Sequence, residues 1–294
     1  MTHVEDELVS QPDCWIRAAA EAPGHAAALP AAGERVAIVG CGTSYFMAQS
    51  AAALREGAGQ GETDAFPASE FPHGRSYDRV VALTRSGTTT EVLELLDRSR
   101  GRTRTTAITA DPRTPVMAAA DDVVVLDFAD ERSVVQTRFA TTALTLLRAH
   151  LGLHTDEVVA DARTALADPL PEGLLDCGQF TFLGRGWTVG LANEAALKMR
   201  EASLAWTEAY PAMEYRHGPI SVTTGGTATW MLGEAPEGLA AQVRQTGALW
   251  IAGDLDPLAD LIRAQRLAVA LAAARGLDPD RPRHLTRSVI LAGS

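Results

Sequence analysis

A strand–turn–helix pattern occurs twice in this chain, and it constrains the fold more than any other feature of the sequence. The segments RVAIVGCGTSYFMA and FTFLGRGWTVGLA each place a short apolar run before Gly-x-Gly and the start of a helix rich in small residues. The glycine pairs, Gly40 with Gly42 and Gly184 with Gly186, lie 144 residues apart (184 − 40). Because nearly half of the chain separates the copies, we expect two subdomains of similar α/β fold.

Apolar strand-like runs alternate with helical patterns in both halves. This alternation predicts two αβα sandwich subdomains with mainly parallel sheets. The segment ADPLPEGLLD is the expected linker, so the predicted subdomains are residues 1–167 and 168–294. The expected strands and helices are as follows: strands in 80–83, 106–111, 122–128, 227–234 and 247–253; helices from 91 onward, in 134–151 and in 261–276.

The bulk composition excludes several classes of partner. With 46% hydrophobic and 21% charged residues the chain has an ordinary globular composition, and no apolar run approaches the ~20 residues of a membrane helix. A net charge of −11 argues against nucleic acid and anionic membranes as partners. Three scattered cysteines without CxxC spacing, and an acidic start without a secretory signal, predict reduced thiols, no metal site and a cytoplasmic location.

The segment TRSGTTTE, Thr84 to Glu91, places five hydroxyl side chains around one glycine at a predicted helix start. Free N–H groups and the positive end of the helix dipole make such a place an anion site. One hydroxyl is enough for an N-cap, so this excess favours a phosphomonoester cradle over a plain capped turn. The Gly-x-Gly turns do not complete a dinucleotide fingerprint, because Tyr45 and Val189 stand where a third small residue is needed. No cofactor is therefore expected.

Three carboxylates recur at intervals of seven in the second half. If one helix runs through Glu194, Glu201 and Glu208, they share a narrow stripe with Lys198, and apolar residues fill the rest of the surface. The stripe is either a thin solvated edge or an ionic face lining a cleft. Downstream, His217 precedes Gly-Pro in YRHGP, a constrained loop that suits a positioned proton carrier.

Together these segments resemble the sugar isomerase (SIS) family in its tandem form. The matching parts are GCGTSY, the loop at Thr84 to Thr89, SVVQTR, EAALKMRE, AYPAMEYRHGP and DRPRHLTRSV. The resemblance is to the isomerase half of glucosamine-6-phosphate synthase and to stand-alone hexosamine-phosphate deaminases and ketose/aldose isomerases. It covers nearly the whole chain.

The resemblance implies roles for individual residues. Thr43, Ser44, Thr84, Ser86 and Thr89 would hold the phosphate, and Gln136 would line the sugar pocket. Glu201 would move a proton between C1 and C2 of the sugar, with Lys198 one turn back helping to keep it ionised. His217 would open the sugar ring and would reach the site from the other subunit of a homodimer. On this view the cleft interpretation of the carboxylate stripe is preferred.

Two positions depart from the synthase pattern. Arg287 stands where the synthase has a lysine that forms a Schiff base, and a guanidinium cannot do that chemistry. Arg85 replaces an uncharged glutamine, and ketose/aldose isomerases resemble this chain in both places. By the same resemblance, Arg85 and Lys198 would be among the substrate-binding residues. The sequence begins at the SIS region without a glutaminase segment, which we interpret as disfavouring amination.

The expected function is cofactor-free isomerisation or deamination of a hexose or hexosamine 6-phosphate, in which Arg287 orients the substrate by charge. One alternative is a deglycase that cleaves a phosphorylated Amadori compound by the same enediol chemistry. The other is a sugar-phosphate sensor without catalysis. The sequence contains no basic recognition helix and retains Glu201 and His217, so the sensor is disfavoured.

Overall fold

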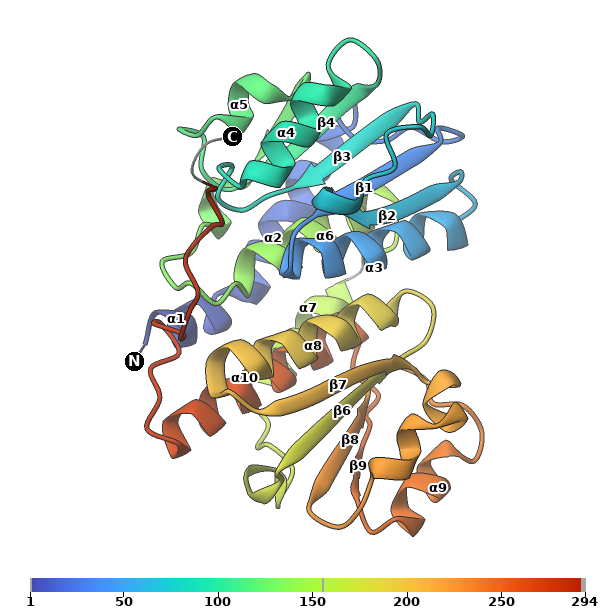
Figure 1. The fold of residues 1–294 in the computed structure, drawn as a ribbon, viewed down its shortest axis with the longest axis vertical. Coiled ribbons are helices and arrows are strands. Elements are labelled where there is room, and N and C mark those ends of the chain that lie inside the picture. The colour runs from blue at the N-terminus through green and yellow to red at the C-terminus, as the bar shows by residue number, and fades with distance from the viewer. Residues whose placement is uncertain (1, 155, 292–294) are drawn as a thin grey trace. The chain divides into compact units, whose positions relative to one another are not determined.

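A computed structural model describes residues 2–154 and 156–291 and contains two parallel β-sheets (Figure 1). The strands of the first sheet are β1 (Val36–Gly40), β2 (Thr63–Pro67), β3 (Arg79–Leu83), β4 (Arg104–Thr109) and β5 (Asp122–Val125). Those of the second are β6 (Gln179–Gly184), β7 (Trp206–Pro211), β8 (Thr227–Met231) and β9 (Leu249–Ile251). The strand orders are β2-β1-β3-β4-β5 and β7-β6-β8-β9, so the two sheets repeat one topology.

The contacts divide the chain into two compact units, each built around one sheet. Unit 2, which holds the five-stranded sheet, comprises residues 13–132, 136–154 and 285–294, and unit 1 comprises residues 1–12, 133–135 and 155–284. The predicted boundary at residue 167 falls between the two sheets. Short segments on either side of it nevertheless pack with the unit of the opposite half of the chain.

Helices cover both faces of the sheet in unit 2. They are α2 (Gln11–Glu21), α3 (Thr43–Gly57), α4 (Thr90–Ser99), α5 (Val116–Ala119) and α6 (Arg138–His150), with 3₁₀ turns η1 (Ala22–His25), η2 (Ala68–Glu70) and η3 (Asp127–Ala129). α3 and α6 lie on one face, and α4 and α5 on the other. Every residue of β1 and β3 is buried, as expected of central parallel strands that are covered on both sides.

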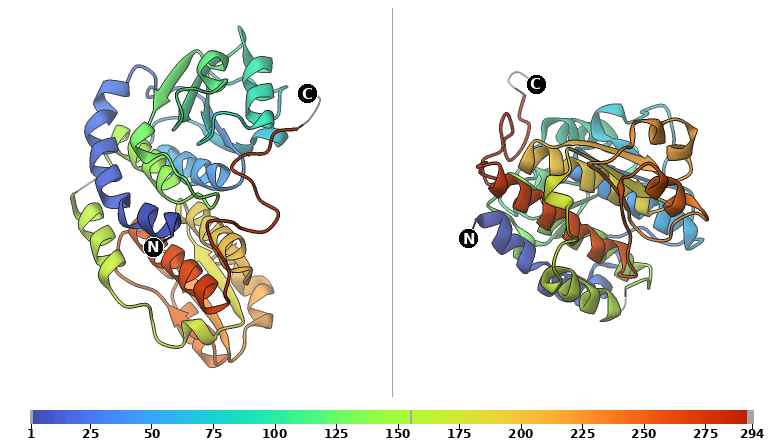
Figure 2. Two further views of the ribbon diagram at one scale, coloured as in Figure 1. Left: turned by 90° about the vertical axis from the view of Figure 1, so that its left-hand side faces the viewer. Right: turned by 90° about the horizontal axis from the view of Figure 1, so that it is seen from below.

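Unit 1 is layered in the same way. Its helices are α1 (His3–Val9), α7 (Asp156–Ala167), α8 (Thr188–Ser203), α9 (Leu239–Gln245) and α10 (Pro257–Ala274), with 3₁₀ turns η4 (Leu174–Asp176), η5 (Glu214–His217) and η6 (Pro219–Val222). α7, α8 and α10 pack together on one face, and α10 lies beside α7 in the views of Figure 2. The expected α/β fold with two mainly parallel sheets is confirmed, because the strand pairs of both sheets are all parallel.

Two predicted helices are shorter in the structure than in the prediction. α8 ends at Ser203, where Leu204 adopts the left-handed conformation (φ 55°) that closes many helices. Glu208 therefore lies in β7. The prediction that three carboxylates share one helix is wrong for Glu208 and holds for Glu194 and Glu201. The aromatic residues and Thr of WTEAYP favour a strand over a longer helix. α6 begins at Arg138, so the SVVQT segment is not helical.

Candidate functional site

Two hydroxyl-bearing turns lie at neighbouring positions on the edge of the five-stranded sheet in unit 2. The turn after β1 leads into α3, which begins with Thr43 and Ser44, and β3 is followed by the Thr84–Thr89 loop. β1 and β3 are adjacent and parallel, so both turns leave the same edge of the sheet. The chain moves outward in opposite directions from this strand pair, and such switch points are where open α/β sheets bind ligands. The structure thus brings together the residues predicted to hold phosphate.

Backbone geometry fixes the shape of both turns. Gly42 (φ 54°) forms the N-cap of α3, and a Cβ at Gly40 would lie 2.6 Å from the carbonyl carbon of Ser44. Gly87 has a φ of 62°, and a Cβ there would lie 2.1 Å from Thr114 Oγ1. Only glycine fits at these close approaches.

The hydroxyls of the Thr84–Thr89 loop differ in what they bond. The Thr84 and Ser86 oxygens accept weak bonds from the amides of Gly87 and Thr88, each 3.3 Å long. An accepting hydroxyl keeps its own proton for donation to an anion. Within residues 2–154 and 156–291, the hydroxyls of Ser44 and Thr89 have no hydrogen-bond partner.

The C-terminal segment 287–291, called the tail here, lies along the same loop within unit 2. Thr88 Oγ1 and Ser288 Oγ are 2.8 Å apart, and the Thr90 amide donates to the Val289 carbonyl over 3.2 Å. The Leu291 amide donates in turn to Thr90 Oγ1 over 3.0 Å. The tail therefore takes up the Thr88 and Thr90 hydroxyls and leaves that of Thr89 to a ligand.

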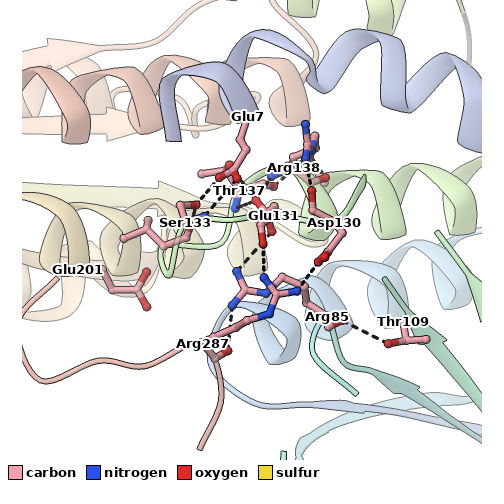
Figure 3. Close-up of polar contacts among 12 residues, drawn as sticks. Glu7, Arg85, Thr109, Asp130, Glu131, Ser133, Thr137, Arg138, Glu201 and Arg287 are labelled. Carbon is pink, nitrogen blue, oxygen red and sulfur yellow. Dashed lines mark hydrogen bonds and ion pairs between the residues drawn. The ribbon is translucent and has the colours of Figure 1, made fainter. Parts of the chain in front are cut away.

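Arg85 is buried and lies in a cluster of polar side chains with Asp130, Glu131 and Arg287 (Figure 3). Its guanidinium lies 3.7 Å from the Glu131 carboxylate and donates to the Arg287 carbonyl over 2.9 Å. The Arg287 guanidinium bonds the Glu131 carbonyl and pairs with Asp130. The sequence analysis missed Asp130 and Glu131. A carboxylate at position 131, three residues before the predicted helix 134–151, was the one signal available.

Gln136 has a buried amide oxygen without a hydrogen-bond partner in the part of the chain that the structure describes. A buried acceptor of this kind is costly unless a ligand or water donates to it. This observation fits the predicted place of Gln136 beside a sugar. Cys41, between the two glycines of the β1 turn, is a free thiol. Burial, with a smaller contribution from Glu91, raises its pKa to about 11, so the thiol is protonated at neutral pH.

In unit 1, α8 carries a buried row of one cation between two carboxylates. Lys198 is 1% exposed and lies 3.5 Å from Glu194, four residues before it. It also pairs with Glu201, three residues after it, and the Glu201 side chain is 19% exposed. Glu201 borders a pocket of about 30 Å³ that Arg281 and Arg283 also line, which is the size of one water molecule.

His217 ends the 3₁₀ turn η5 and is exposed. The turn is anchored by Tyr215, which is fully buried and shares its hydroxyl with Thr223 and Thr229. In the described residues, the His217 imidazole has neither a hydrogen bond nor an ion pair. An anchored loop with an uncommitted imidazole suits a proton carrier that meets its substrate, or a second subunit, in solution.

A hollow of about 590 Å³ also lies in unit 1, between α1 and α10. Its walls are mainly apolar, and its Arg266 already donates to the carbonyls of Ala165 and Asp168. Arg266 is the one cation among the residues that line it. Neither unit, within residues 2–154 and 156–291, has a helix both long and apolar enough to cross a bilayer.

The fold and the paired turns define a doubly wound α/β protein with a hydroxyl-lined switch point. Residues 30–151 match the family model of the SIS domain, which confirms the resemblance inferred from the motifs. The chain is 28% identical over 315 residues to the isomerizing glutamine–fructose-6-phosphate aminotransferase of Gloeobacter violaceus, covering 87% of this chain. It spans about half (52%) of that relative.

Solved structures of related proteins have the same fold. Glucosamine-6-phosphate deaminase from Thermotoga maritima matches with a TM-score of 0.80 and 26% identity, covering 99% of this chain and 100% of the other. Tagatose-6-phosphate ketose/aldose isomerase from Escherichia coli also gives 0.80, over 100% of this chain and 97% of its own. At 19% identity, that second likeness concerns the fold alone.

Proposed function

We propose that this protein binds a hexose or hexosamine 6-phosphate and moves a proton between C1 and C2 of the sugar without a cofactor. The observation that carries the proposal is the pair of hydroxyl-bearing turns at the β1–β3 switch point. The names of the relatives, an isomerizing glutamine–fructose-6-phosphate aminotransferase and a glucosamine-6-phosphate deaminase, support the same substrate class. We assign the phosphate to the five hydroxyl residues Thr43, Ser44, Thr84, Ser86 and Thr89.

Glu201 is the proposed base. His217 first opens the ring: it gives a proton to the ring oxygen and takes the proton of the C1 hydroxyl as the bond between C1 and the ring oxygen breaks. Glu201 then takes the C2 proton of the open-chain sugar while the C1 carbonyl oxygen takes a proton from solvent, which gives an enediol or enolamine. Glu201 returns its proton at C1 while the C2 hydroxyl or amine loses one to solvent. In the deaminating direction water hydrolyses the resulting imine, so that ammonia and a ketose 6-phosphate leave. No step requires a covalent bond to the protein.

Lys198 and Gln136 have supporting roles in this proposal. A base must be ionised before it can accept a proton, and Lys198 is the cation that pairs with Glu201. Gln136 offers its unpartnered amide oxygen to a sugar hydroxyl. A homodimer in which His217 serves the partner's site, and a cytoplasmic location, remain predictions from the sequence.

The deciding experiment is an assay of hexose and hexosamine 6-phosphates and one phosphorylated Amadori compound for ketose and ammonia. Glu201→Gln keeps the shape of the side chain and removes the base, so kcat should fall by roughly 10²–10⁴ while KM stays near wild type. Glu208→Gln, on β7, is the matched control and should keep wild-type kcat. Turnover of the Amadori compound alone would reassign the protein as a deglycase. Exchange of the C2 hydrogen at the wild-type rate in Glu201→Gln would identify another base.

A further inference from the structure

We infer that Arg85 and Arg287 are positioning residues that hold the tail against the Thr84–Thr89 loop, and that neither contacts the substrate. This inference rests on the proposed function in one respect, because it takes that loop as the phosphate site. It changes the expectation drawn from the sequence, in which Arg85 bound substrate and Arg287 acted on it by charge. Arg85, Asp130, Glu131 and Arg287 are called the clasp below.

Glu131 is the fixed point of the clasp. Its Oε1 accepts the amides of Thr137 and Arg138 over 2.6 Å each, and the Thr137 hydroxyl over 3.1 Å. These bonds cap the start of α6 and hold the carboxylate in one orientation. The Glu131 side chain is 0% exposed, and the Arg85 side chain 3%. A carboxylate that is fixed and buried in this way requires a nearby cation, and Arg85 supplies one.

Arg85 uses the same guanidinium to hold the tail. One terminal nitrogen faces Glu131, and the other donates to the Arg287 carbonyl over 2.9 Å. A planar guanidinium can serve two acceptors at fixed angles, which glutamine and lysine cannot do in the same way. The backbone of Arg85 is held as well, since its carbonyl accepts the Ala110 amide over 3.2 Å.

Arg287 closes the clasp from the tail side. Its guanidinium donates to the Glu131 carbonyl and to the Asp130 carboxylate. Its positive charge is therefore paired with a carboxylate of the protein. The tail residues that follow Arg287 bond Thr88 of the loop and Thr90, the first residue of α4. The two arginines therefore decide which loop hydroxyls the tail covers. Through the tail, they determine which hydroxyls remain for phosphate.

The test is hydrogen exchange of the Thr90 and Leu291 amides, both of which bond between loop and tail, in Arg85→Gln, Arg287→Gln and the double variant. Each single variant should exchange at least tenfold faster than wild type, and the double variant no more than about threefold faster than Arg85→Gln, because both break one clasp. Arg104→Gln is the matched control. It removes a half-exposed arginine paired with Asp122 in the same unit and should exchange at the wild-type rate.

Three results would overturn the inference. One is wild-type exchange of both amides in Arg85→Gln, and another is independent, multiplying effects of the two substitutions. The third is a tenfold loss of inorganic phosphate affinity in Arg85→Gln that is absent in Arg287→Gln, which would show direct contact with the anion. If Arg85→Gln fails to fold, exchange in Arg287→Gln alone decides, and a wild-type rate there is again contrary. Amide exchange needs no substrate, so a failure of the proposed function leaves this result readable.

Discussion

At the scale of single residues, the shape of the Thr84–Thr89 loop depends on Gly87 more than on any one hydroxyl. Its positive φ is reached by other residues at a cost of about 1–2 kcal/mol. Its close approach to Thr114 and Val116 adds a steric conflict, because the Val116 amide is itself bonded to the Gly87 carbonyl over 3.2 Å. The backbone at Val116 therefore cannot move away from the loop without breaking that bond.

Gly87→Ala should destabilise the protein by more than the cost of its φ alone and should weaken phosphate binding at least tenfold. Gly101→Ala is the matched control, because Gly101 has a similar φ (+70°) but nothing within 4 Å of an added Cβ. Urea unfolding should show a loss of about 1 kcal/mol for Gly101→Ala and a larger loss for Gly87→Ala. Equal losses of unfolding free energy in the two variants would mean that Thr114 and Val116 move aside without cost.

The loop hydroxyls could be predicted from sequence because they lie in one short segment at the start of a helix. The clasp could not. Glu131 is 46 residues from Arg85 (131 − 85), and a charged pair looks the same in sequence whether it is buried or exposed. The roles that the resemblance implied for Arg85 and Arg287 contained no information on where their guanidinium groups point. That depends on tertiary packing.

At the scale of elements, the position of helix ends was the least predictable feature. The interval of seven that joined Glu201 to Glu208 suggested one helix, but Leu204 reverses the chain between them. Whether a leucine adopts a positive φ depends on what surrounds it, and no local pattern indicates it. The strands, in contrast, were predictable because a short, continuous apolar run such as VAIVG is typical of a buried parallel strand.

The start of β4 is joined to the start of β5 by a polar contact with a defined pH dependence. Asp121 accepts the hydroxyl and the amide of Thr105, each over 2.8 Å, and these bonds lower the pKa of its carboxyl. A lowered folded-state pKa stabilises the protein above the unfolded pKa of ~3.9 and is lost as the pH falls through the folded value.

Thr105→Val removes the hydroxyl bond to the Asp121 carboxylate and the bond that the hydroxyl accepts from the Asp121 amide over 2.9 Å, so it should raise the Asp121 pKa toward its ordinary value. It should cost on the order of 1 kcal/mol at pH 7. The part of the cost that comes from the carboxylate should shrink as the pH falls through the folded-state pKa of Asp121. Urea unfolding at pH 7 and at progressively lower pH measures the difference. A cost that does not change with pH would assign the effect to the lost amide bond or to packing of the valine.

At the scale of the whole molecule, the repeat in the sequence predicted the two sheets, but not which segments belong to each unit. Residues 2–12, 133–135, 156–167 and 285–291 belong to the unit to which the linker would not assign them. Short segments follow long-range contacts such as those of the tail, and sequence patterns report only local periodicity.

The proposed homodimer makes a prediction that subunit mixing can test. If His217 serves the partner's site, a dimer of one Glu201→Gln subunit and one His217→Ala subunit has one intact site out of two. Because random assortment makes half of the dimers mixed, co-expression should restore about a quarter of the wild-type activity. Replacing the His217→Ala subunit with the double variant leaves no intact site and is the control. No recovery beyond that control would place both residues in one subunit.

The matching strand orders of the two sheets have a consequence for how such a chain arises. The second switch point, between β6 and β8, keeps the tight turn, since a Cβ at Gly184 would lie 2.3 Å from the Thr188 carbonyl oxygen. Thr188 stands where Ser44 stands in the first copy, but its hydroxyl bonds the Leu232 carbonyl over 2.8 Å. Duplication and fusion of one ancestral half would leave two sheets with the same strand order and the same tight turn. In the proposed function only the first copy binds the phosphate. If the second copy holds no anion, the carboxylates of α8 meet no repulsion from a bound phosphate in their own unit.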